Sequence, residues 1–416
     1  MCKIAVVSVH TSPLSRPGTR DSGGLNVYVR ELSREMAKRG HTIDIFTRRT
    51  DAATPEVTRI GDLTRVIQVA AGPLDADKAA QRRYLETFRK GAMAFVDRVG
   101  QGPSPDLQGY DLVHSHYWLS GWVGQTLADC WNAPHVVMFH TLAEAKNRHH
   151  IGEREPRYRI AGERVVARGA DRIICGSESE RQTLIEEYDV SPSRLSVVPC
   201  GVDVDRFRPL DMVQSRLALG LDPDVPVLLF IGRIEPLKGI DVLIRAVSQL
   251  DGKFQLLVVG GDEKDAMRTH ELHVLAEEMG VEGKVVFGDA VPHDELPRYY
   301  SAASICVVPS YYESFGMVAL EAMACGVPVI ASRVGGLKET VQDGRTGYLI
   351  PWRCPEPFAE RLDLLLTNES LRRSLGEEAR QVAQAYRWPE IAAQVEDVYH
   401  DLVSRYRGVA VGAHVA

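Results

Sequence analysis

Short apolar runs alternate with longer amphipathic stretches from one end of the chain to the other. In the first half, the candidate strands are Ile4–Val9, Thr42–Phe46, Asp111–His114, His135–Phe139, Arg172–Cys175 and Leu195–Val198. In the second half, they are Val227–Ile231, Phe254–Val259, Lys284–Phe287, Ile305–Val308, Pro328–Ala331 and Gly347–Ile350. Continuous apolar runs separated by helical patterns are typical of parallel strands that are buried on both faces. The pattern therefore predicts an α/β fold with doubly wound parallel sheets.

The series of apolar runs starts again near Pro226, after a polar segment punctuated by prolines. A chain of 416 residues is also too long for one ordinary core, so two domains of about 200 residues are expected. We expect two Rossmann-like domains that face a cleft, formed by residues 1–200 and 201–387. The segment after Arg387 has the pattern of an amphipathic helix that neither sheet needs.

Composition and charge narrow the function classes. With 44% hydrophobic and 25% charged residues the chain resembles an ordinary globular protein, and its net charge of -7 argues against a general nucleic-acid binder. No apolar run approaches the length of a membrane span, and the opening MCKIAVVSV suits a buried strand better than a signal peptide. Seven scattered cysteines without a C-x-x-C pair suit a reducing cytoplasm and give no zinc signal. We therefore expect a cytoplasmic protein.

The most informative segment is VPSYYESFGMVALEAMACGVPVIASRVGG, at residues 308–336. An apolar run ends in a loop with Glu313, Ser314 is the expected N-cap of a helix that carries Glu321, and a glycine turn closes the segment. This layout places a phosphorylated ligand at a helix N-terminus. The two glutamates lie about 10 Å apart along a helix axis, a wider spacing than the pair of a glycoside hydrolase needs. The spacing fits the two ends of a sugar nucleotide, although a capping acid plus a solvated helix acid remains the alternative.

Two cations follow the expected strand Val227–Ile231 in the sequence GRIEPLKG. Arg233 and Lys238 would form a diphosphate clamp, with arginine as a bidentate fork and lysine as a point charge. Ligands bind at the carboxyl ends of such strands, which favours this interpretation over two solvated surface charges. Near the first strand, the pair Gly23-Gly24 opens a helix and would let an anion approach its N-terminus; a turn that needs positive φ is the alternative.

Histidines also follow apolar runs. His140 ends the run His135–Phe139, and this position favours a role in the site over a structural one. His114 and His116 are spaced like metal ligands, but no third ligand shares the pattern, so we predict no metal there. Two cations and two hydroxyls elsewhere in the N-terminal half would suit a phosphate monoester, although the pattern alone does not group them; they are Lys78, Tyr117, Thr141 and Arg159.

Several of these motifs resemble a known family. GRIEPLKG, PSYYESFGMVALEAMACGVPVIAS and VGGLKETVQDGRTGYL are similar to the nucleotide-sugar half of retaining GT-B glycosyltransferases of group 1 (GT4), which include sucrose-phosphate synthase. The spacing from Glu313 to Glu321 matches the E-x7-E signature of that group. In the N-terminal half, HTSPL, PGTRDSGGLNVYV, AAGP, DLVHSHYWLSG and HTLAEAKN resemble the glycosyltransferases of mycothiol biosynthesis.

The resemblance implies a retaining hexosyltransferase that moves N-acetylglucosamine from its UDP form to 1D-myo-inositol 3-phosphate. The partners would be a UDP-sugar donor and a phosphorylated acceptor, and a homodimer would be the family type. A sucrose-phosphate-synthase-like enzyme, with another hexosyl donor or fructose 6-phosphate as acceptor, is the alternative. A non-catalytic sugar-nucleotide binder is disfavoured because the charged donor residues are all present. The last segment, 388–408, would cross back onto the first domain.

The resemblance also implies residue roles. The catalytic residues would be His140, Arg233, Lys238 and Glu313. The donor would contact Arg16, Pro17, Gly24, Arg233, Lys238, Glu313 and Glu321, with the uracil at the backbone near Val291. The acceptor would contact His10, Asp21, Ser22, Gly23, Gly24, Leu25, Asn26, Lys78, Tyr117, Thr141 and Arg159.

Two segments depart from the family pattern. Residues 148–158 differ from it, which makes Arg159 the weakest of these assignments, and residues 51–110 match loosely. The family can carry magnesium through carbonyls that would fall around Tyr300, Ser301 and Ala303, but the side-chain ligand expected at position 327 is Val here. We therefore expect no required cofactor and no metal among the site residues.

Overall fold

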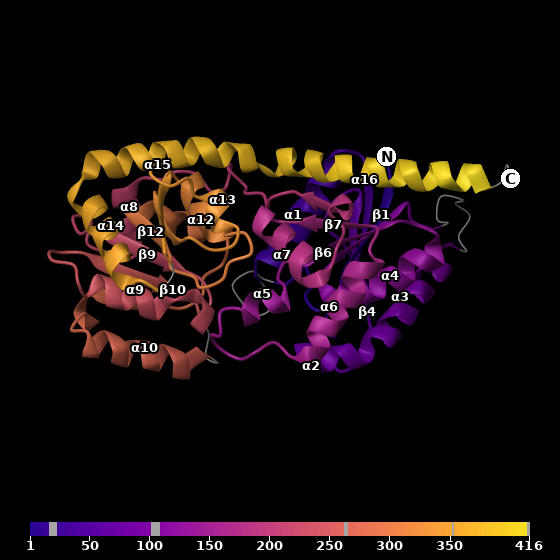
Figure 1. The fold of residues 1–416 in the computed structure, drawn as a ribbon, viewed down its shortest axis with the longest axis horizontal. Helices are drawn as coiled ribbons and strands as arrows, with labels where there is room; N and C mark the ends of the chain where they lie inside the picture. Colours follow the sequence, from indigo (N-terminus) through magenta and orange to yellow (C-terminus); the bar gives the residue numbers. More distant parts are fainter. Residues whose placement is uncertain (16–22, 101–108, 262–264, 352, 414–416) are drawn as a thin grey trace.

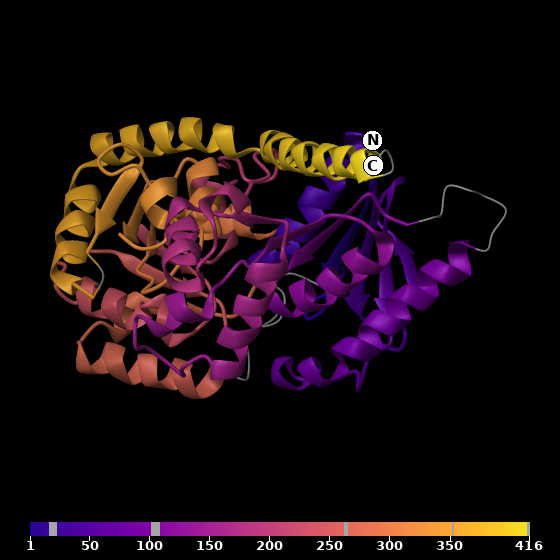
Figure 2. The same ribbon diagram turned by 45° about the vertical axis from the view of Figure 1, so that its right-hand side comes forward.

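The computed structural model describes residues 1–15, 23–100, 109–261, 265–351 and 353–413. Two α/β domains lie next to each other along the long axis of the molecule (Figure 1). Helices α15 and α16 follow one another along one side, α15 over the C-terminal domain and α16 over the N-terminal domain, in both views (Figures 1 and 2). Of the helices in the described ranges, none combines the length and the apolar character that crossing a membrane requires.

The N-terminal domain is built on an eight-stranded sheet with the order β3-β4-β2-β1-β5-β6-β7-β8. Its strands are β1 Lys3–Ser8, β2 Thr42–Arg48, β3 Val57–Arg59, β4 Thr64–Val69, β5 Leu112–His116, β6 His135–Met138, β7 Arg172–Cys175 and β8 Leu195–Val197. Its helices are α1 Gly24–Lys38, α2 Lys78–Gln81, α3 Leu85–Gly100, α4 Trp118–Trp131, α5 Ala143–Asn147, α6 Arg157–Gly169 and α7 Glu178–Tyr188. All neighbouring strands are parallel except β3 and β4, which pair antiparallel.

The C-terminal domain has a six-stranded, fully parallel sheet with the order β11-β10-β9-β12-β13-β14. Its strands are β9 Val227–Ile231, β10 Gln255–Val259, β11 Val285–Gly288, β12 Ile305–Val308, β13 Val329–Ser332 and β14 Gly347–Ile350. The helices of this half are α8 Met212–Ala218, α9 Ile240–Val247, α10 Ala266–Glu278, α11 Leu296–Ala302, α12 Met317–Ala324, α13 Leu337–Thr340, α14 Pro355–Thr367, α15 Glu369–Ala383 and α16 Trp388–Ala413. The order is that of a doubly wound nucleotide-binding sheet.

Each expected strand is present, with ends shifted by at most two residues, so the prediction of parallel α/β sheets is confirmed. Two strands were missed. In β4 the apolar residues are interrupted by Thr64, Arg65 and Gln68, and β3 is a largely exposed edge strand, so neither is a continuous apolar run. The expected N-cap at Ser314 was wrong: helix α12 begins at Met317, after Gly316 with φ of 97°.

The last helix ties the two halves together. One apolar cluster contains Val29 of the first domain, Leu320 of the second and Val395 of α16. The segments that cross between the domains also touch, because the Val202 N–H donates to the Tyr386 carbonyl at 2.8 Å. The chain therefore passes between the domains twice, at adjacent places.

Candidate active site

Polar residues gather at the carboxyl ends of the central strands in both sheets. In the C-terminal sheet the strand order reverses between β9 and β12, where Lys238 and Glu313 follow the strand ends. In the N-terminal sheet it reverses between β1 and β5, where His10 and Tyr117 follow the strand ends. In open α/β sheets ligands bind at such reversals, so each sheet offers a binding crevice.

Lys238 and Glu313 form an ion pair at the C-terminal crevice. The Lys238 Nζ donates to Glu313 Oε2 at 2.6 Å, and the two side chains are 22% and 20% exposed. Arg233 is more exposed and pairs with Glu235, with 2.6 Å between Nη1 and Oε1. Because an ammonium has three N–H donors, Lys238 can hold Glu313 and still donate to an anion. The structure thus brings a predicted clamp residue and a predicted sugar-binding residue into direct contact.

Two glycines let the surrounding loops approach each other. Gly239 has φ of 68°, and a Cβ added there would lie 2.1 Å from the Pro309 carbonyl oxygen. At Gly335, with φ of 46°, an added Cβ would lie 1.7 Å from the Glu313 carbonyl oxygen. That oxygen accepts the Gly336 N–H at 3.1 Å. Only glycine fits both the backbone angle and the contact, so these turns fix the main chain that carries Glu313.

The starts of helices α1 and α12 face each other across the domains. A Cβ added to Gly24, the first residue of α1, would lie 2.8 Å from the Met317 sulfur at the start of α12. A cavity beside them is lined by Val27 and Glu31 of α1 and by Met317 and Glu321 of α12. Helix N-termini present unpaired N–H groups and favour negative charge. The two helix starts therefore bring unpaired N–H groups close together, whereas the cavity beside them is lined by the carboxylates of Glu31, Asp203 and Glu321 and does not itself suit an anion.

Glu321 is buried at 5% exposure and both of its oxygens are bonded. Tyr300 Oη donates to Oε2 at 2.8 Å, and His293 Nε2 lies 2.8 Å from Oε1. Arg206 donates to His293 Nδ1 at 3.3 Å, so the histidine proton sits on Nε2 and points at Glu321. Sequence reasoning missed His293 and Arg206 as partners. His293 does lie shortly after β11, the strand-end signal that identified Arg233.

His140 follows β6 and is held in an unusual conformation. Its φ is 62°, a left-handed value that is uncommon for a residue other than glycine. Its Nε2 lies 2.9 Å from Nδ1 of His116, and the Tyr28 ring meets it edge-on at 5.2 Å between centroids. Burial lowers the pKa of His140 to about 3, so the ring is neutral at ordinary pH. His116, suggested by its spacing as a metal ligand, instead bonds this histidine.

Three of the residues expected at the acceptor lie together. Arg159 Nη2 donates to Thr141 Oγ1 at 2.8 Å, and the guanidinium lies 5.1 Å from the centre of the Tyr117 ring. Arg159 is only 4% exposed and is paired at 2.7 Å with both Glu155 and Glu163. Its charge is therefore largely matched by carboxylates, and its contact with Thr141 leaves that hydroxyl hydrogen available for another acceptor.

The other expected site residues lie on several different elements. His10 lies 4.4 Å from the Tyr117 ring between centroids, and Asn26 Oδ1 accepts from Thr11 Oγ1 at 2.5 Å. Gly23 is the N-cap of α1, Leu25 packs between two apolar clusters, and Lys78 is the first residue of α2. Val291 lies between β11 and α11. Arg16, Pro17, Asp21 and Ser22 lie outside the described residues.

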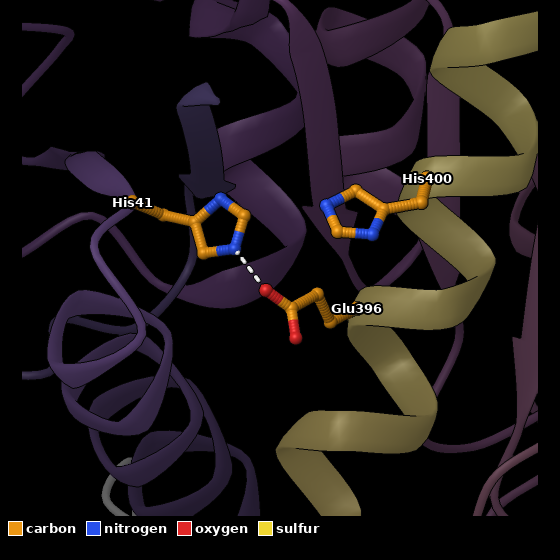
Figure 3. A group of neighbouring side chains, drawn as sticks. All are labelled: His41, Glu396 and His400. Atoms are coloured by element: carbon orange, nitrogen blue, oxygen red, sulfur yellow. Dashed lines mark hydrogen bonds and ion pairs between the residues drawn. The ribbon is translucent and has the colours of Figure 1, made fainter. Parts of the chain in front are cut away.

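A group of residues that often bind metals lies where α16 crosses the N-terminal domain (Figure 3). Within the described ranges, His41, Glu396 and His400 have ligand atoms that all lie within 4.8 Å of one another. The Cys2 N–H donates to His41 Nδ1 at 3.2 Å, so His41 Nε2 carries the proton and donates to Glu396 Oε1 at 2.7 Å. A metal-bound histidine has the opposite arrangement, with its second nitrogen donating outward. Because Arg39 also pairs with Glu396 Oε2 at 2.6 Å, we interpret Arg39, His41 and Glu396 as a latch, the α16 latch.

Comparison with known proteins defines the class. Residues 22–206 match the model described as Glycosyltransferase Family 4, and residues 213–382 match Glycosyl transferases group 1. Sucrose-phosphate synthase from Thermosynechococcus elongatus superposes with a TM-score of 0.88 at 35% identity, covering 97% of this chain and 100% of that one. Anabaena HepE in complex with UDP-glucose shares the fold, with a TM-score of 0.72, 20% identity and coverage of 97% and 100%. Two facing parallel-sheet domains of this kind define the GT-B glycosyltransferases.

Proteins with similar sequences identify the family more closely. The D-inositol 3-phosphate glycosyltransferase of Corynebacterium glutamicum is 39% identical, with 97% of each chain covered. D-inositol 3-phosphate glycosyltransferase 2 of Catenulispora acidiphila is 42% identical, with 99% of this chain and 98% of that one covered. The chain therefore belongs to the group 1 glycosyltransferases, and it is an enzyme that transfers a sugar.

Proposed function

We propose that this enzyme transfers N-acetylglucosamine from a UDP-sugar to 1D-myo-inositol 3-phosphate, with retention of the anomeric configuration. The observation that carries the proposal is the pair of helix starts at Gly24 and Met317, with the Lys238–Glu313 pair beside the crevice. The relatives named for D-inositol 3-phosphate support the acceptor. The solved complex of HepE with UDP-glucose supports a UDP-sugar as donor.

On the donor side, the charges suit a sugar diphosphate. Lys238 and Arg233 would bind the phosphates together with the N–H groups at the start of α1. Glu313 would accept from hydroxyls of the sugar, and Glu321 from both ribose hydroxyls. Glu321 already accepts from Tyr300 and His293, but a carboxylate offers about four lone-pair sites, so two remain. His140 would bond the sugar next to the reacting carbon.

On the acceptor side, the Tyr117, Thr141 and Arg159 group would take the phosphate. The Thr141 hydroxyl accepts from Arg159, so its own hydrogen can go to a phosphate oxygen. Because Glu155 and Glu163 offset the charge of Arg159, the second cation must come from elsewhere. Lys78, at the start of α2, is the candidate for that cation.

The proposed transfer needs no separate protein base. The acceptor hydroxyl attacks the anomeric carbon from the face that UDP leaves. The bond from that carbon to the β-phosphate oxygen breaks, the bond to the acceptor oxygen forms, and the acceptor proton moves to the departing phosphate oxygen. Arg233, Lys238 and the helix start after Gly23-Gly24 would stabilise the charge that grows on the diphosphate, so no metal is required. Closure of the two domains would exclude water and protect the sugar nucleotide.

A substrate panel tests the proposal. UDP or GDP release is measured with UDP-N-acetylglucosamine, UDP-glucose and GDP-mannose, each against inositol 3-phosphate, fructose 6-phosphate, free inositol or no acceptor. We expect the fastest release with UDP-N-acetylglucosamine and inositol 3-phosphate, and none above background with free inositol. Equal rates with inositol and its phosphate would refute the acceptor assignment. An inverted anomeric centre in the product, read by NMR coupling, would refute retention.

Transfer of a hexose to fructose 6-phosphate is the second candidate function. It is favoured by the likeness to sucrose-phosphate synthase at 35% identity over almost the whole chain. The same panel separates the two candidates. If the second candidate is correct, UDP release with UDP-glucose and fructose 6-phosphate exceeds that of every other donor and acceptor pair.

A further inference from the structure

The bond between His116 and His140 joins the ends of two neighbouring strands. His116 is the last residue of β5 and lies opposite Met138 of β6. His140 follows Met138 by two residues in the sequence. His116 Nδ1 lies 2.9 Å from His140 Nε2. His116 is 1% exposed, whereas His140, which follows the end of β6, is half-buried. The inner histidine therefore touches the outer one directly.

The hydrogen bond between the two rings determines which nitrogen of His140 carries its proton. Both rings are neutral, because burial lowers the pKa of His140 to about 3 and holds that of His116 well below its usual range. A neutral imidazole carries one hydrogen, and one hydrogen lies in the shared bond. If His116 donates, the hydrogen of His140 sits on Nδ1; if His140 donates, its Nδ1 is a bare acceptor. The bond thus sets whether His140 Nδ1 donates or accepts.

The surroundings of His116 leave it little freedom. Its ring lies 4.2 Å from that of His114 between centroids, and His114 Nδ1 lies 2.6 Å from the Tyr399 hydroxyl on α16. Tyr28 meets both His116 and His140 edge-on, at 5.6 and 5.2 Å between centroids. His140 itself has a left-handed backbone, a conformation that persists only where neighbours enforce it. The side chains packed around His116, those of His114, Tyr399 and Tyr28, therefore hold its ring in place, and through it the ring of His140.

We propose that His116 is the positioning residue of His140, fixing both the orientation of its ring and the nitrogen that carries its proton. His140 Nδ1 then presents one defined hydrogen-bonding function to the donor sugar. No protein partner of that Nδ1 is found among the residues that the structure describes. This inference rests on the proposed role of His140 in holding the donor sugar. His116 acts through His140 and contacts no ligand itself.

Two amide substitutions separate the role from simple packing. In His116→Asn the amide occupies the place of Nδ1, so a partner for His140 Nε2 is kept. In His116→Gln the amide lies one bond further out, and the partner is lost. We expect kcat/KM for the UDP-sugar to fall roughly tenfold in His116→Gln, the size of one lost hydrogen bond, and to stay within about threefold in His116→Asn. The Kd of UDP, which has no sugar for His140 to bind, should stay unchanged in both.

The matched control is His135, another buried histidine of the same sheet, whose Nε2 bonds Ser115 Oγ at 2.8 Å. Because His135 bonds through Nε2, which an Asn amide does not reach, His135→Asn should lower the melting temperature without changing the KM of the donor. A double-mutant cycle completes the test: because His116 acts through His140, adding His116→Gln to His140→Ala should change kcat/KM less than about twofold.

Each outcome decides the question. An equal loss from His116→Gln with and without His140, or equal activity of the Asn and Gln variants, would overturn the positioning role. If His140→Ala alone leaves donor kinetics unchanged, the proposed function of His140 fails instead. Should His116→Gln not fold, His116→Leu takes its place in the same cycle, with the same expected loss.

Discussion

Gly24 and Met317 are the first residues of two helices from different domains, and they lie close together. A Cβ added to Gly24 would lie 2.8 Å from the Met317 sulfur. The sulfur is near the end of a flexible side chain, which can move away from a methyl group. A branched side chain at position 24 would instead push the helix starts apart.

Substituting Gly24 tests whether the two helix starts act together. We expect Gly24→Val to lower kcat/KM roughly 10²-fold, because misplacing groups around the reacting centre by an ångström has that effect. Adding Met317→Ala, which removes the contacting sulfur, should recover part of the loss. Steady-state UDP release measures both. Wild-type activity in Gly24→Val would show that the spacing of the helix starts is not needed.

Lys238→Ala removes the cation that holds Glu313. We expect kcat/KM to fall at least ~10²-fold, because one charge-stabilising group is lost and the carboxylate is left unpaired beside the diphosphate. Lys253→Ala, an exposed lysine of the same domain, is the control and should keep full activity. A loss of less than about threefold in Lys238→Ala would remove this residue from the clamp.

Glu321→Gln should weaken the binding of UDP itself. The amide offers one acceptor oxygen where the carboxylate offers two, and His293 already points an N–H at this side chain. We expect the Kd of UDP to rise roughly tenfold or more by calorimetry, in line with lost bonds to a charged group. An unchanged Kd would place the ribose elsewhere.

Thr141→Val keeps the shape of the side chain and removes its hydroxyl. We expect the KM of inositol 3-phosphate to rise roughly tenfold, since a hydrogen bond to a charged group is lost, while the KM of the UDP-sugar stays the same. Thr183→Val, at a threonine on α7 that bonds the Ser179 carbonyl, serves as the control. Parallel increases in both KM values would point to general unfolding of the site.

The α16 latch should respond to pH. Burial alone would raise the pKa of Glu396, but the bonds from His41 and Arg39 outweigh it and leave the pKa below its usual value. A lowered pKa in the folded state means that the stabilisation is present above the ordinary carboxyl pKa and is lost as the pH falls through the folded value. Glu396→Gln should therefore lower the melting temperature by about 1–3 °C at pH 7, and this difference should shrink as the pH falls into the acid range. A difference that persists at acid pH would contradict the assignment.

Most site residues were predicted from the sequence because they follow the ends of expected strands. Lys238 and Glu313 are far apart in sequence, yet both follow central strands, and parallel strands end at one edge. The partners of Glu321 were missed: His293 does follow a strand, β11, but nothing in the sequence joins it, or Tyr300 of α11, to Glu321. The pairing of Arg159 with Glu163 could have been read from its i,i+4 spacing on one helix, and it changes the charge available to a phosphate.

The parts of the fold that the sequence did not predict have a similar cause. Continuous apolar runs identified strands that are buried on both faces, whereas β4 mixes apolar residues with Arg65 and Gln68 and gave no run. The start of α12 depends on the left-handed turn at Gly316, which the apparent cap at Ser314 concealed. The bond between His116 and His140 depends on the register of two strands, which a single sequence does not determine.

The two crossings between the domains are bonded to each other through Val202 and Tyr386. A molecule whose halves are joined at two distant places resists rotation of one half against the other. Here both connections pass through one place, so the halves can turn about a single pivot without stretching either connection. Trp388, which begins α16 beside that pivot and packs against Tyr28 at 5.5 Å between centroids, ties the pivot to the ring that also meets His140. The pivot between the domains and the ring of His140 are therefore joined through a single side chain, that of Tyr28.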